Sequence, residues 1–242
     1  YAAGPLYDLV PLGAAFLLMI LVTLTAGLLA VRVDSMLIAI LGIIGGFCTP
    51  IMLSSGEANF IVLYTYLFML GVGILALAHY KSWRLLNYLG FALTWALVLG
   101  SLTQYEKTDF PAVMTLTSLL FVLHSSIVYW HNVVRNEKCT VLEIIYLIGN
   151  SAIFSLTAYG LISYTYGRPW PAVLTILLAA FFTTHVFVFL KLERGDRTLL
   201  VAMIALAGFY LTLTVPLLAE KESITMGWAL FALLFLWLSK TV

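Results

Sequence analysis

The sequence predicts an all-α protein, a polytopic transmembrane helical bundle with about nine spans. Hydrophobic residues make up 63% of the 242 residues and charged residues only 10%, whereas soluble domains carry roughly 25% charged residues. The apolar runs continue over roughly 20 residues, the length at which a helix crosses ~30 Å of hydrocarbon. Strands of a membrane barrel would alternate apolar and polar residues instead. We therefore expect one transmembrane helical domain, residues 1–242.

Short polar connections divide the apolar runs. RVDS separates the first two runs, and LSSGEAN precedes the third. KSWR, TQYEKTD and HNVVRNEKCT introduce the fourth, fifth and sixth, and YGRP, ERGDR and EKES introduce the last three, of which the ninth is the shortest. None of these connections is long enough to hold a soluble domain. The expected spans are 9–31, 35–53, 60–79, 85–103, 112–130, 141–164, 170–190, 199–218 and 224–238.

The distribution of lysine and arginine predicts the orientation, because cytoplasmic loops are enriched in positive charge. With nine spans, nine of the 12 basic residues fall on one side and three on the other: Lys107, Arg168 and Lys221. The nine-residue side is therefore expected to be cytoplasmic, with the N-terminus outside and the C-terminus inside. Five of the six tryptophans lie near span ends, where their rings favour the interface. Trp95 lies mid-span and is expected to pack against another helix.

Two segments resemble each other at an offset of 60 residues. FPAVMTLTSLLFVLHSSIVYW begins at Phe110 and WPAVLTILLAAFFTTHVFVFL begins at Trp170. Each starts with an aromatic–proline pair and is followed by a basic loop and a second span. The pattern indicates a duplicated helical hairpin, as occurs in transporters, although apolar sequences also align by chance.

Several function classes lack the residues they need. No acidic or basic residue lies deep in a predicted span, which argues against charged proton relays and voltage sensing. The sequence has no metalloprotease, nucleophile-elbow or phosphate-loop motif, and Cys48 and Cys139 form no metal or disulfide pattern. A net charge of +1 offers no basic face for nucleic acid. We expect no enzyme, no cofactor and no metal.

A polar layer is the first candidate site. His124, Ser125, Asn150, Thr184 and His185 fall in the predicted cytoplasmic halves of the fifth, sixth and seventh spans. Such side chains either line a cavity or substrate path, or hold helices together by hydrogen bonds worth about 0.6 kcal/mol each. Both interpretations stay open at this stage.

The second candidate site is a helix break in the outer part of the second span, GGFCTP, comprising Gly45, Gly46, Thr49 and Pro50. Proline has no N–H, so the carbonyl of Gly46 loses its helical partner. The glycines let a neighbouring helix approach closely. The break is either a kink with close packing or a polar notch facing a cavity, formed by the Gly46 carbonyl and Thr49.

The stretch from Tyr7 to Trp95 resembles a bacterial family of predicted multi-pass membrane proteins classed as a domain of unknown function. The shared features are Asp34-Ser35, the GGFCTP break, the LSSG that ends the span, and the KSWR turn; usual members carry leucine where Cys48 stands. The resemblance implies a location in the bacterial inner (cytoplasmic) membrane, and members are typically longer, so the chain is expected to be a fragment. It implies no activity.

These observations favour a non-catalytic scaffold or an accessory or assembly subunit of a bacterial inner-membrane complex. Its partners would be membrane lipids and other membrane subunits, or further spans of its own longer chain. The alternative is a transporter or flippase for a neutral, lipidic or envelope-glycan substrate, which the broken second span and the polar layer favour.

Overall fold

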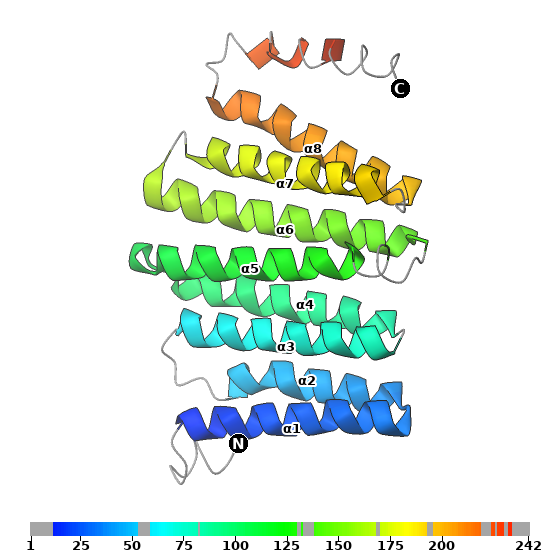
Figure 1. The fold of residues 1–242 in the computed structure, drawn as a ribbon. Helices are drawn as coiled ribbons and strands as arrows, with labels where there is room; N and C mark the ends of the chain where they lie inside the picture. Colours follow the sequence, from blue (N-terminus) through cyan, green and yellow to red (C-terminus); the bar gives the residue numbers. More distant parts are fainter. Residues whose placement is uncertain are drawn as a thin grey trace. The chain divides into compact units, whose positions relative to one another are not determined.

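The structure is a computed structural model, and it describes residues 12–52, 59–81, 83–129, 132, 138–167, 170–192 and 196–218, with short pieces of 224–233. All regular secondary structure in these residues is helical (Figure 1). The helices are α1 (Leu12–Val33), α2 (Met36–Met52), α3 (Phe60–Tyr80), α4 (Arg84–Ser101), α5 (Phe110–Tyr129), α6 (Val141–Tyr166), α7 (Pro171–Leu192) and α8 (Arg197–Leu218).

Six of these helices are long and apolar enough to cross a membrane, namely α3 to α8, counted within the described residues. The apolar stretches found in α1 and α2 are shorter, Leu18–Val33 and Met36–Met52. The first eight expected spans coincide with α1 to α8, with ends that differ by a few residues. Most of the expected ninth span, 224–238, lies outside the described residues. The multi-pass helical architecture is confirmed, whereas the count of nine and the orientation stay predictions.

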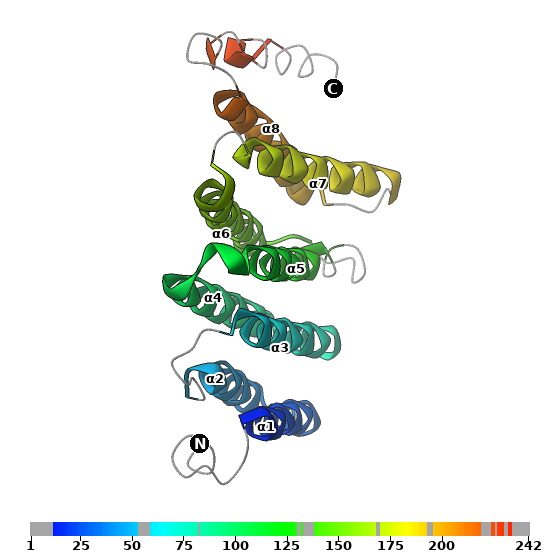
Figure 2. The same cartoon turned by 90° about the vertical axis from the view of Figure 1, so that its left-hand side faces the viewer.

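The chain divides into two compact units, residues 1–127 and 128–242. In the first unit, α1 packs against α2 and α3 against α4, and further contacts join α2 to α4 and α1 to α3. The paired helices lie side by side in two perpendicular views (Figures 1 and 2). Trp95 in α4 is 2% exposed, which confirms the expectation that it packs inside the bundle.

The hairpins of the first unit are held together at one end by an ion pair. Asp34 stands between α1 and α2 with a φ of 55°, a left-handed conformation that aspartate and asparagine tolerate better than most residues. Its carboxylate lies 2.6 Å from Nζ of Lys81, the residue that follows α3. The Lys81 backbone N–H also donates to the Leu77 carbonyl and closes the last turn of α3. The α1–α2 turn and the end of α3 therefore meet.

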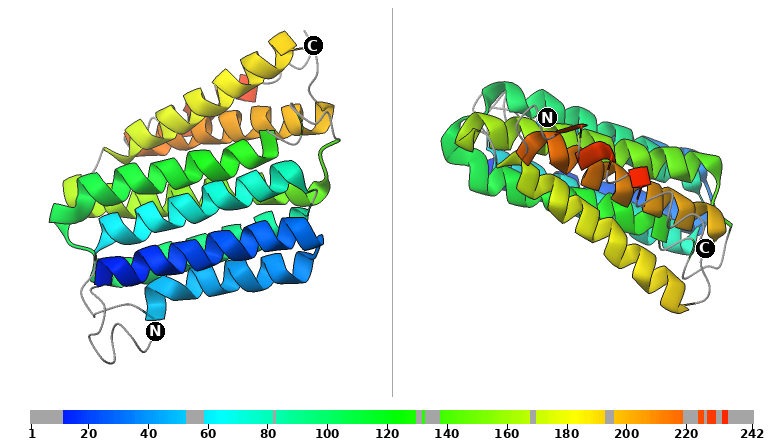
Figure 3. Two further views of the ribbon diagram at one scale, coloured as in Figure 1. Left: turned by 60° about the horizontal axis from the view of Figure 1, so that its bottom comes forward. Right: turned by 90° about the horizontal axis from the view of Figure 1, so that it is seen from above.

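In the second unit, α7 packs along α8 (Figure 3), and α6 contacts both. A capping box starts α6: the Thr140 hydroxyl accepts from the Glu143 N–H, and the Glu143 carboxylate accepts from the Thr140 N–H. Asp196 begins α8 by accepting from the Thr198 N–H at 2.8 Å. Its other carboxylate oxygen accepts from the Cys139 N–H at 2.8 Å. Asp196 thus joins the residues before α6 to the start of α8.

Candidate functional site

The helix break at Pro50 is closed by a hydrogen bond from the next helix. Helix α2 continues through Pro50 to Met52. Because the proline nitrogen carries no hydrogen, the Gly46 carbonyl has no donor in its own helix. The Tyr66 hydroxyl of α3 donates to that carbonyl at 2.9 Å, in a buried position. The carbonyl freed by the proline is therefore used to connect α2 to α3.

Two threonines complete a small polar cluster around this bond. Thr49 is fully buried, and its hydroxyl donates to the Gly45 carbonyl at 3.0 Å. The hydroxyls of Thr49 and of Thr23, from α1, interact with the Tyr66 hydroxyl. We call the Gly46 carbonyl, Thr23, Thr49 and Tyr66 the polar notch. It gathers polar groups from three helices at one level of the first unit.

The two glycines of the break differ in their surroundings. A methyl group on Gly46 would lie 3.1 Å from Thr23 Cγ2 and 3.2 Å from Leu70 Cδ2, which is tighter than ordinary packing. A methyl group on Gly45 would meet nothing within 4 Å, and Gly45 is exposed. The expected close approach therefore occurs at Gly46, where side chains of α1 and α3 press against the backbone. At Gly45 the space is open.

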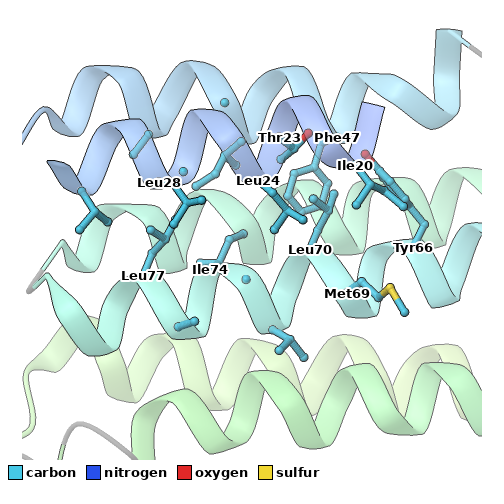
Figure 4. A pocket seen from close by; sticks show the side chains of 18 of the residues that line it. Ile20, Thr23, Leu24, Leu28, Phe47, Tyr66, Met69, Leu70, Ile74 and Leu77 are labelled. Carbon is cyan, nitrogen blue, oxygen red and sulfur yellow. The ribbon is translucent and has the colours of Figure 1, made fainter. Parts of the chain in front are cut away.

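A cavity of about 790 Å³ adjoins the polar notch, between α1, α2 and α3 (Figure 4). Its lining is almost wholly hydrocarbon. Tyr66 and Ile20 lie at one end of the close-up, and Leu77 and Leu28 lie toward the other. The Tyr66 and Thr23 hydroxyls at the notch end are engaged in hydrogen bonds. The cavity is thus shaped for apolar contact, with its polar groups already satisfied by the protein.

Sequence reasoning did not find this cavity. Its walls come from positions on three helices, and no single segment shows it. Glycines at 27, 42 and 73 all line it. Small residues of this kind were the available signal in the sequence, and on their own they would equally have indicated close helix packing.

The predicted polar layer divides between the two units. In the first unit, His124 is 2% exposed and its ring meets the edge of Phe91 at 5.6 Å between centroids. Its neighbour Ser125 is fully buried. The structure thus places both side chains inside the helical packing of that unit.

The other three layer residues lie in the second unit, in different settings. Asn150 in α6 is fully buried. His185 in α7 has Nδ1 2.8 Å from the Phe181 carbonyl of its own helix, and its ring stacks on Tyr129 at 4.3 Å. Thr184 is exposed and donates to the carbonyl of Ala180, also in its own helix. The layer as a cavity or substrate path therefore stays a prediction.

A family model described as a predicted membrane protein, DUF2339, matches residues 1–241. The chain belongs to the DUF2339 family. The match spans nearly the whole chain, well beyond the hundred residues that carried the resemblance. It agrees with the helical membrane architecture described above. No curated protein and no solved structure matches the chain.

The second unit of the DUF2339 chain contains hydrogen bonds between helices that sequence reasoning missed. Tyr210 of α8 lies 2.6 Å, hydroxyl to hydroxyl, from Ser151 of α6, and donates to the Ser151 carbonyl at 3.0 Å. The hydroxyls of Thr175 in α7 and Thr214 in α8 lie 2.9 Å apart. The Tyr210 ring stacks on Phe182 of α7 with centroids 6.0 Å apart. A tyrosine in the middle of a span was the available signal, because a buried phenol usually finds a partner.

The described residues of the DUF2339 chain contain no group of three histidines, cysteines or carboxylates that could hold a metal ion. Several polar side chains in the described spans bond to the backbone of their own helix or to a neighbouring helix, whereas the buried hydroxyls of Thr94 and Thr157 have no hydrogen-bond partner among the described residues. The arrangement can position helices and enclose an apolar chain.

Proposed function

We propose that this DUF2339 protein is a non-catalytic scaffold or accessory subunit of a bacterial inner-membrane complex. One observation carries the proposal: several polar groups within the described spans are paired with other helices of the chain. The Gly46 carbonyl pairs with Tyr66, and Ser151 pairs with Tyr210. Groups bonded in this way fix helix positions, and they are not available to bind a polar substrate.

The apolar character of the larger cavity supports the same proposal. A path for a polar substrate needs side chains that replace the hydration shell of that substrate. The cavity between α1, α2 and α3 offers hydrocarbon, and its two hydroxyls at the notch end are engaged. A rigid frame with an apolar cavity suits the holding of lipids and neighbouring helices.

The first part of the test is assembly, in membranes from cells that carry the full-length chain. After mild solubilisation, native electrophoresis should show the chain in a complex heavier than the chain itself. Depletion of the chain should leave the other subunits of that complex unassembled, and re-expression of the wild-type chain should restore the complex. A chain that migrates alone, with other membrane complexes unchanged on depletion, would contradict the proposal.

A second candidate is a flippase for a lipidic substrate, favoured by the lateral cavity that ends at the polar notch. Vesicles containing the full-length protein and a fluorescent lipid distinguish the two functions. A membrane-impermeant quencher reaches only outer-leaflet lipid, so a scaffold leaves the inner-leaflet fluorescence intact. Protein-dependent loss of that fluorescence would support the flippase and overturn the scaffold.

A further inference from the structure

The cavity between α1, α2 and α3 is elongated along the helices. Its lining runs from Ile20 to Val31 on α1 and from Tyr66 to Tyr80 on α3. At 1.5 Å per residue these stretches are about 16 Å and about 21 Å long. One leaflet of a ~30 Å hydrocarbon core is about 15 Å thick. The cavity therefore has the length of one acyl chain in one leaflet.

The lining of the cavity suits a hydrocarbon chain. Its volume is about 790 Å³, and its walls are almost wholly apolar side chains of α1, α2 and α3. An acyl chain is unbranched and apolar along its length, so it can fill this space without leaving a polar group of its own unpaired. The lining and the length together favour a lipid chain.

One end of the cavity is positively charged. Val31 and Tyr80 line this end, and they are followed directly by Arg32 and Lys81. The Lys81–Asp34 ion pair brings the two chain segments together at 2.6 Å. Arg32 is exposed, and the described carboxylates form no ion pair with it.

A third cation, Arg84, and two aromatic residues, Tyr80 and Trp83, lie within three residues of Lys81 in the sequence. Arg84 starts α4, and Lys81 Nζ lies 5.9 Å from the centre of the Trp83 ring. Tyr80 is 74% exposed. The chain segments at this end thus carry three cations, Arg32, Lys81 and Arg84, and one carboxylate, Asp34, together with aromatic residues that favour the membrane interface. The distribution of lysine and arginine predicts that this end is cytoplasmic, the side on which anionic lipids are concentrated.

We propose that this cavity binds one acyl chain of an anionic phospholipid, with the lipid phosphate against Arg32 and Lys81. The opposite end, at the polar notch, needs no polar group from the ligand because Tyr66 already bonds to the Gly46 carbonyl. The site thus requires a ligand with its charge at one end only. This inference goes beyond the scaffold proposal, and it holds whether the protein assembles partners or moves lipids.

The test is native mass spectrometry of the full-length protein in detergent. Phosphatidylglycerol and phosphatidylcholine with identical acyl chains are titrated separately. Phosphatidylglycerol should bind more tightly, and Arg32→Gln should weaken its binding about fivefold, the equivalent of ~1 kcal/mol for one basic residue. Phosphatidylcholine binding should change little. Lys107→Gln, between α4 and α5, is the matched control and should leave both lipids unaffected.

Asp34→Asn gives an effect of the opposite sign. Asparagine tolerates the left-handed backbone at this position, and the substitution removes the negative charge that faces Lys81. Phosphatidylglycerol binding should strengthen, by an amount that falls as salt is added. Equal binding of the two lipids to the wild-type protein, or weaker phosphatidylglycerol binding by Asp34→Asn, would overturn the assignment of the phosphate.

A cavity-filling variant tests the acyl chain. Gly73 lines the cavity, and a methyl group there meets nothing within 4 Å, so Gly73→Leu should lower the binding of both lipids. Gly160→Leu in α6 has equally open space outside this cavity and should leave binding unchanged. If Gly73→Leu does not fold, Gly27→Leu repeats the test from α1, where the nearest side-chain atom is 3.8 Å away. Undiminished lipid binding in a folded filled variant would refute the acyl-chain site.

Discussion

The hydrogen bond from Tyr66 to the Gly46 carbonyl should depend energetically on Pro50. Tyr66→Phe removes the hydroxyl and keeps the ring, so the Gly46 carbonyl loses the donor seen at 2.9 Å. Pro50→Ala restores a backbone N–H four residues after Gly46, which is the donor that the proline removed. A carbonyl oxygen has two lone pairs, so it accepts both bonds when both donors are present.

The expected magnitude follows from the burial of this bond. A buried acceptor left without a donor costs about 1–3 kcal/mol, and hydrogen bonds between membrane helices average about 0.6 with a maximum near 1.7 kcal/mol. We therefore expect Tyr66→Phe to destabilise the wild-type protein by about 1–2 kcal/mol. In the Pro50→Ala background the same change should cost less than about 0.5 kcal/mol, because the helix itself then supplies a donor. The coupling energy should be about 1 kcal/mol.

The assay is reversible unfolding of the full-length protein in mixed micelles, with all four members of the double-mutant cycle measured together. Tyr64→Phe is the matched control, because its hydroxyl lies 3.0 Å from that of Ser101 in α4 and is not the donor to the Gly46 carbonyl. Its cost should be the same in the wild-type and Pro50→Ala backgrounds. If the Tyr66→Phe and Pro50→Ala effects add to within about 0.3–0.5 kcal/mol, the proposed link between them is wrong.

Three further results are expected from unfolding measurements. Gly46→Ala should destabilise the protein by about 1–2 kcal/mol, because the added methyl group would press on side chains of α1 and α3. Gly45→Ala adds its methyl group at an open helical position and should be neutral or stabilising. Tyr210→Phe should cost about 0.6–1.7 kcal/mol through the loss of both bonds to Ser151; an unchanged midpoint would contradict this. The Thr198 N–H is the main cause that lowers the pKa of Asp196 below 3.8, assisted by the Cys139 N–H. The stability contributed by ionised Asp196 is present above its unfolded-state pKa and is lost as pH falls through its lower folded-state pKa. Asp196→Asn should therefore lose less stability than the wild-type protein when the pH is lowered below about 4. An unaltered pH profile would refute this role.

The helices could be predicted from the sequence because the pattern that indicates them is local. Each apolar run of about 20 residues is bounded by a polar turn, so each run predicts a span without reference to the rest of the chain. The break at Pro50 was predictable for the same reason, since the loss of an N–H follows from one residue. Trp95 was predictable as buried because it lies far from any span end.

The partners of these residues could not be predicted, because they depend on which helices are neighbours. Nothing in α2 indicates that the donor for Gly46 is Tyr66, twenty residues later in α3. Gly45 and Gly46 look alike in sequence, and the rotation of α2 alone decides which of them faces Thr23. Equivalent positions of the two similar segments also differ, since His124 is buried and Thr184 is exposed.

The most direct test of the account is an experimental density map of the full-length protein in a lipid nanodisc containing anionic phospholipid. The central claim is that the polar notch is closed by the Tyr66–Gly46 hydrogen bond and that the cavity beside it holds a hydrocarbon chain. The map should show unbranched chain density along α1 and α3, no waters within the cavity, and the Tyr66 hydroxyl on the Gly46 carbonyl. A continuous file of waters from the polar notch into the cavity, with Tyr66 turned away from Gly46, would contradict the claim.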